Sequence, residues 1–135
     1  MRRWKGKEMS KIKMTFAEIN GIIPVMNVIV QVKMPYDISY QLYKITKNLD
    51  EANDYFVNKY REIIDSKSET AEEEVNKLAS TEVELATEKI EDAKLIFALE
   101  AGDAKLSAVD IRMLSKLMEK GSEETVIEPG FTFVE

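Results

Sequence analysis

The residue types that most often carry out catalysis are scarce in this chain of 135 residues. It contains neither histidine nor cysteine, which removes the commonest general base, the thiolate nucleophile and the usual ligands of zinc. The glycine-rich loops that bind phosphate and the Gly-x-Ser-x-Gly turn of hydrolases are also missing. Carboxylates are abundant, but no Asp/Asn spacing matches a calcium loop. We therefore expect no enzyme, and no cofactor or metal site.

The densest run of carboxylates, Glu72 to Glu74, has a structural explanation. Thr70 and Glu73 match a capping box, in which the threonine caps a free N–H and the glutamate reaches back. Acidic residues at this position also suit the positive end of a helix dipole. The run predicts the start of a helix rather than a catalytic site.

Three tyrosines recur at the spacing of adjoining helical turns: Tyr36, Tyr40 and Tyr43. Tyrosine joins an apolar ring to a polar hydroxyl, which makes it common in protein interfaces. The alternative, which we favour, is that the rings cover the edge of the core while their hydroxyls remain in water. We keep the three residues as a candidate contact face.

These tyrosines belong to the segment around which the chain is organised, residues 35–65. Its apolar or small residues follow one another at alternating steps of three and four, as on the packing face of a helix. They are Ile38, Leu42, Ile45, Leu49, Ala52, Phe56, Tyr60 and Ile63. The pattern predicts a helix of about thirty residues and about 45 Å.

A shorter helix is predicted before it, because Thr15 and Glu18 form a capping box and apolar residues then recur at helical spacing. Pro24 lies inside this pattern, so we expect a kink, or a break near Gly21. The connection before Pro35 is short, which favours an antiparallel pair. The shorter helix can cover only the first part of the longer one.

The uncovered far half of the long helix must then meet the C-terminal region or another chain. We predict partner contacts there at Phe56, Tyr60, Ile63 and Ile64. After a polar linker, the sequence predicts a short helix up to about Ala79 and a strand over Glu82 to Ala86.

The remaining segments are less uniform. Lys89 to Gly102 fits either a buried strand or a helix that ends at Gly102. Ser107 caps a last helix that stops at Gly121, and the tail from Val126 to Glu135 fits a small strand or a docking arm.

The predicted fold is mainly α within a single domain. An N-terminal antiparallel helical hairpin with one long helix (about 35–65) is followed by a small α+β C-terminal region. The predicted parts are a basic, flexible leader (1–13), the hairpin (14–67) and the α+β region packed on it (68–135).

Charge is distributed unevenly along the chain. Residues 1–13 carry a net charge of +5, whereas the remaining residues carry −11. The acidic part should be repelled by nucleic acid phosphates, so we expect no nucleic acid binding by the folded part. The leader is most simply a solvated terminus, although it suits contact with nucleic acid, acidic lipid or the acidic body, and Met14 is an alternative start. No segment predicts a signal peptide or a membrane span.

The order of these features resembles a small family of phage and prophage proteins of uncharacterised function, from phages of Gram-positive bacteria. The resemblance covers about residues 14–120 and is carried by TFAEINGIIPVMNVI, PYDISYQLYKITKNLDEANDYFVNKYREIID, EEEVNKLASTEVEL and LSAVDIRMLSKLME. It implies a phage-encoded accessory protein, plausibly from the tail or late-gene region, and transfers no active-site residue.

Two functions of different classes follow as hypotheses. The first is a non-enzymatic assembly protein whose long helix packs against a virion protein or a second copy of itself. The second is a small acidic inhibitor of a host or defence protein, whose acidic surface could imitate DNA. Either protein would act in the host cytoplasm, and the first could be incorporated in a phage particle.

Overall fold

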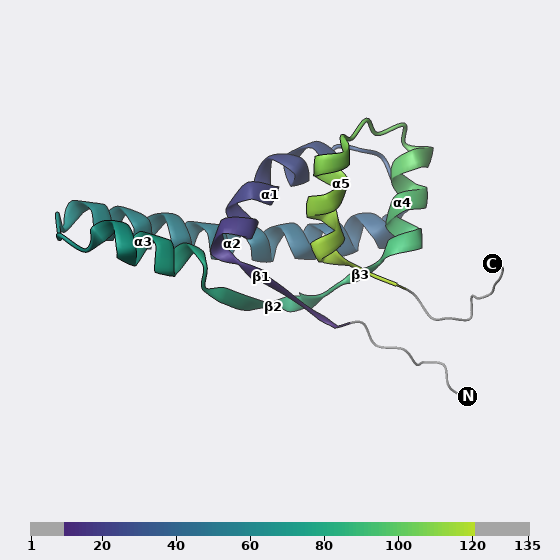
Figure 1. The fold of residues 1–135 in the computed structure, drawn as a ribbon. Helices are drawn as coiled ribbons and strands as arrows, with labels where there is room; N and C mark the ends of the chain where they lie inside the picture. Colours follow the sequence, from purple (N-terminus) through teal and green to yellow (C-terminus); the bar gives the residue numbers. More distant parts are fainter. Residues whose placement is uncertain (1–9, 121–135) are drawn as a thin grey trace, which may run out of the picture.

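The computed structural model describes residues 10–120, which form a mainly helical fold with a small sheet region (Figure 1). This part of the chain contains five α-helices: α1 (Phe16–Ile29), α2 (Tyr36–Asp65), α3 (Ala71–Ala79), α4 (Asp92–Ala101) and α5 (Ala108–Leu114). It also contains four short strands: β1 (Lys11–Thr15), β2 (Glu82–Glu88), β3 (Ile90–Glu91) and β4 (Met118–Glu119). The prediction of a mainly α fold with one long helix and a small α+β part is confirmed.

Helix α1 begins at the predicted capping box. The Thr15 side chain accepts a hydrogen bond from the backbone N–H of Glu18, and the Glu18 carboxylate accepts one from the N–H of Thr15. The predicted break near Gly21 is wrong, because α1 is continuous through Pro24. Proline removes the N–H that would bond the Asn20 carbonyl, but both residues are exposed, where water can take its place.

Helix α2 contributes one row of side chains to the core. These are Ile38, Leu42, Ile45 and Leu49, each of which is buried. Buried side chains of α1 pack against this row, and the two helices run antiparallel. The start of α1 lies beside the second half of α2, since Phe16 stacks on Phe56. Its end lies beside Leu42. The N-terminal helix pair is therefore as predicted.

The second half of α2 extends beyond the rest of the molecule together with α3, as Figure 1 shows at the left. Helix α3 has no fully buried residue, and Val75, Leu78 and Ala79 are its half-buried side. Its predicted capping box is wrong. The Thr70 hydroxyl instead donates to the Glu74 carboxylate at 2.6 Å, so it does not cap the helix. We call residues 56–79 the arm.

The four strands pair segments that lie far apart in the sequence. Strand β1 pairs antiparallel with β2, and β3 pairs parallel with β4. The assignment of residues 11–13 to a flexible leader is wrong: they form most of β1, and Ile12 is fully buried. The sheet region is therefore not confined to residues 68–135. Residues 1–9 of the predicted leader lie outside the described residues.

The segment from Lys89 to Gly102, for which strand and helix were both open, is largely helix α4, preceded by the two-residue strand β3. Its buried side chains, Leu95, Ala98 and Leu99, fall at helical spacing. Helix α5 begins at a capping box made by Ser107 and Asp110 and continues as a 3₁₀ turn over Ser115–Leu117. The predicted continuation of this helix to Gly121 is wrong, because α5 ends at Leu114 and Met118–Glu119 form β4. The tail from Val126 lies outside the described residues.

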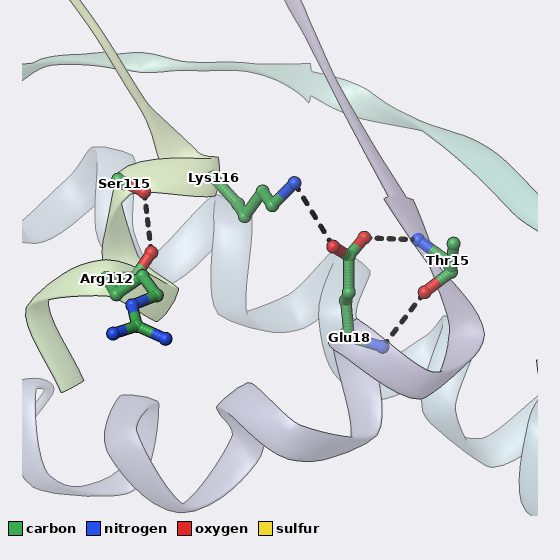
Figure 2. A network of polar contacts seen from close by, with 5 residues as sticks. All are labelled: Thr15, Glu18, Arg112, Ser115 and Lys116. Atoms are coloured by element: carbon green, nitrogen blue, oxygen red, sulfur yellow. Dashed lines mark hydrogen bonds and ion pairs between the residues drawn. The ribbon is translucent and has the colours of Figure 1, made fainter. Parts of the chain in front are cut away.

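A polar network ties the last turn of this region back to α1. Figure 2 shows Glu18 between Thr15 and Lys116, whose ammonium lies 3.1 Å from the Glu18 carboxylate. The hydrogen bond from the Thr15 N–H and the attraction of Lys116 hold the pKa of the Glu18 carboxyl below its usual range, against the opposing effect of partial burial. The network therefore fixes the start of α1 against the C-terminal region.

Candidate protein-interaction surface

The predicted contact face on α2 forms an exposed row of stacked rings. Tyr36, Tyr40 and Tyr43 are 82%, 49% and 58% exposed. The ring centroids of Tyr36 and Tyr40 lie 6.1 Å apart, and those of Tyr40 and Tyr43 lie 6.2 Å apart. The ammonium of Lys44 lies 5.1 Å from the centre of the Tyr40 ring. We call these three residues the tyrosine row.

An apolar groove of about 520 Å³ adjoins this row, and Tyr43 belongs to both. The groove arises where α1 ends at Ile29 and the chain turns back into α2, leaving apolar side chains of the turn at the surface. Its apolar lining consists of Ile29, Val30, Val32, Met34, Leu42 and Tyr43. A volume of this size falls in the range of ordinary binding sites.

Three carboxylates on two adjoining turns of α2 line one end of the groove: Asp50, Glu51 and Asp54. Lys47 is the one basic residue in the lining. Among residues 10–120, none of the three carboxylates forms an ion pair. The groove therefore carries uncompensated negative charge beside an apolar floor.

The wall of the groove also contains an unpaired polar atom. The Oγ1 atom of Thr46 is buried and has no hydrogen-bond partner within the described part of the chain. A buried hydroxyl without a partner lowers stability by about 1–3 kcal/mol. This part of α2 therefore contains a buried hydrogen-bonding group that no other described residue pairs with.

The second predicted set of contact residues lies in and beside the arm. Phe56 is half-buried, because its ring stacks on Phe16 with the centroids 5.5 Å apart. Ile63 is also half-buried, whereas Tyr60 and Ile64 are exposed. Phe56 thus belongs to the edge of the core, and Tyr60 and Ile64 remain available for contact.

The structure does not bring the two predicted sets together. Tyr43 and Phe56 are thirteen residues apart on one straight run of helix, which corresponds to about 20 Å. A small partner would therefore use either the tyrosine row and groove or the arm.

Sequence reasoning missed the groove itself. Val30, Val32 and Met34 follow the end of α1 and were interpreted only as the end of a helical pattern. Apolar residues in a short turn before a proline are a usable signal, because such a turn has little core to enter. The side chain of Phe97 in α4, which is 71% exposed, was also missed, because the sequence left open whether its segment is a strand or a helix.

Among the residues that the structure describes, no three carboxylates lie close enough to hold a metal ion. No helix in residues 10–120 is long and apolar enough to cross a bilayer. No family model, no curated protein and no solved structure matches the chain.

Proposed function

We propose that this protein is a non-enzymatic accessory protein that acts by binding another protein through α2. The observation that carries the proposal is the continuity between the tyrosine row and the apolar groove. Exposed aromatic side chains beside an apolar depression are typical of interfaces, because they bury a large area with little loss of side-chain freedom. An exposed patch of this kind has no evident role in the fold of residues 10–120.

We further propose that the protein is encoded by a phage and takes part in assembly of the virion, either in the host cytoplasm or within the particle. This part of the proposal rests only on the order of sequence features over residues 14–120, which resembles a family of phage proteins; no family model matches the chain. The long α2 helix fits such a role, since it offers a contact surface at each end.

The test is comparative capture of partners by the tagged protein and by two variants, from the host cells in which the protein is made. Tyr36→Ser/Tyr40→Ser/Tyr43→Ser removes the row, while Phe97→Ser/Val109→Ser removes exposed apolar side chains from α4 and α5. We expect one or more proteins to be retained by the wild type and by the second variant, and to fall about tenfold or more with the first. Equal capture by all three proteins, with each variant folded by circular dichroism, would refute the proposal.

A further inference from the structure

We propose that the groove beside Tyr43 binds a basic amphipathic helix of the partner protein. This inference rests on the proposed function and specifies the chemistry of the partner. It is carried by three properties of the surface: the shape of its apolar floor, the sign of its charge and the chemistry of the tyrosine row.

The groove has the dimensions of a docked helix. Its lining on α2 extends from Ser39 to Asp54, which is about 22 Å or four helical turns. Facing side chains come from the end of α1 and from the following turn, notably Val30 and Met34. Two such walls accept the apolar residues of an amphipathic helix at positions i, i+3, i+4 and i+7.

The charge of the groove selects a cationic partner. Asp50, Glu51 and Asp54 extend along its far end without ion-pair partners in residues 10–120, and only Lys47 opposes them. An acidic helix placed there would meet like charges, whereas lysine or arginine at its flanks would meet carboxylates. Such complementarity chiefly determines which partner is accepted and how fast it associates.

The tyrosine row favours the same sign of charge. Cations are attracted to the faces of aromatic rings, and the position of Lys44 over the Tyr40 ring shows this preference within the chain itself. Tyr36 and Tyr43 are both more than half exposed. An arginine at the end of a docked helix can therefore stack on the row while the apolar face fills the groove.

The inference can be tested with two synthetic helices of about 15 residues that share leucines at the four apolar positions. One carries lysine and arginine at the flanking positions, and its twin carries glutamate there. Their affinities for the full chain are measured by fluorescence anisotropy at several salt concentrations. We expect the basic peptide to bind at least about tenfold more tightly, and this advantage to shrink as salt rises from about 50 to about 300 mM.

Two pairs of matched variants locate the binding. Asp50→Asn/Glu51→Gln/Asp54→Asn should abolish the preference for the basic peptide. The control, Glu69→Gln/Glu72→Gln/Glu73→Gln, removes the same charge from exposed positions outside the groove and should preserve it. Likewise Val30→Ser should weaken binding by about fivefold, because it removes a side chain from the lining, whereas Val28→Ser should not.

Several outcomes would overturn the inference. They are equal affinity for the two peptides, equal loss in a variant and its control, or concentration-dependent dimerisation that Val30→Ser abolishes, which would make a second copy the occupant. If neither peptide binds in this way while the tyrosine variant still loses its cellular partner, the proposed function stands. Only the inference that the partner segment is a basic helix is then wrong. If both experiments fail, the proposed function fails as well.

Discussion

Glu18 forms an ion pair with a residue that is far away in the sequence. It accepts a hydrogen bond from the Thr15 N–H as part of the capping box and lies 3.1 Å from the ammonium of Lys116 (Figure 2). The first contact is local and could be predicted from four residues of sequence. The second joins residues 98 positions apart, and no sequence pattern indicates it.

We predict that Glu18→Gln lowers the free energy of unfolding near neutral pH by less than about 1 kcal/mol, because the side chain is partly exposed and glutamine can still cap. The native fold lowers the pKa of Glu18, so its stabilising effect is present above the unfolded pKa of about 4.3 and is lost as pH falls through the lower native value. Urea denaturation between about pH 2.5 and 7 should show the two proteins converge in acid.

Glu84 provides the control for this experiment. It pairs with Lys13 at 3.9 Å, but both side chains are more than half exposed. Exposed pairs contribute little, so Glu84→Gln should leave stability nearly unchanged across the same range. A gap between wild type and Glu18→Gln that widens in acid would contradict the assigned role of Glu18.

At the scale of elements, periodicity predicted α1 and α2, because their apolar faces repeat over several helical turns. The seven-residue α5 was indicated mainly by its capping residue Ser107. Strand β1 was missed although Lys11 to Thr15 alternates between charged and apolar residues. An equally short alternation predicted β2, but residues 11–15 were divided between a basic leader and the start of a helical pattern, and their pairing partner lies far away in the sequence. The groove could not be predicted either, since it depends on how α1 meets α2.

Two glycines, Gly21 inside α1 and Gly102 directly after the end of α4, predict opposite effects of substitution by alanine. A Cβ at Gly102 would overlap the Cγ1 atom of Val32 and lie 3.1 Å from the carbonyl oxygen of Lys33. At Gly21, inside α1, a Cβ would meet nothing within 4 Å. We expect Gly102→Ala to lower the free energy of unfolding by about 1–3 kcal/mol through crowding, and Gly21→Ala to raise it by about 0.5–1 kcal/mol.

Urea denaturation of both variants measures these changes directly. A destabilised Gly21→Ala would indicate that α1 is not packed as the structure shows, since alanine is otherwise the better helix former. An unchanged Gly102→Ala would mean that Val32 and the turn can move aside. Because Val32 lines the groove, that result would also show that the groove is adaptable.

At the scale of the whole molecule, helix α2 packs against α1, β2, α3 and α4. The start of α1 reaches the second half of α2, where Phe16 stacks on Phe56, and the end of α2 lies with α3 in the arm (Figure 1). The fully buried positions of α2 end at Leu49, and the half-buried Ala52 and Phe56 continue the edge of the core. The tyrosine row and the first part of the groove therefore lie on the half of α2 that contributes buried side chains to the core.

Part of the basic N-terminal segment is built into the fold. Both backbone polar groups of Ser10 form hydrogen bonds. Its N–H donates to the Glu119 carboxylate at 2.7 Å, and its carbonyl accepts from the Lys89 N–H at 2.8 Å. Ile12 follows as a fully buried side chain. A chain that begins at Met14 lacks all of these contacts and most of β1.

We therefore expect a chain that begins at Met14 to be at least about 2–5 kcal/mol less stable than one that begins at Ser10, because loss of a buried isoleucine alone costs about this much. That is a large share of the about 5–15 kcal/mol that stabilises a domain. Lys11→Ala/Lys13→Ala in the full chain is the control, since it removes the charges but keeps Ile12 and the strand, and it should change stability little. Urea denaturation of the three proteins separates the two causes. Equal stability of the two truncated chains would show that β1 is dispensable, whereas a loss in the lysine variant as large as that of the Met14 chain would assign the effect to charge.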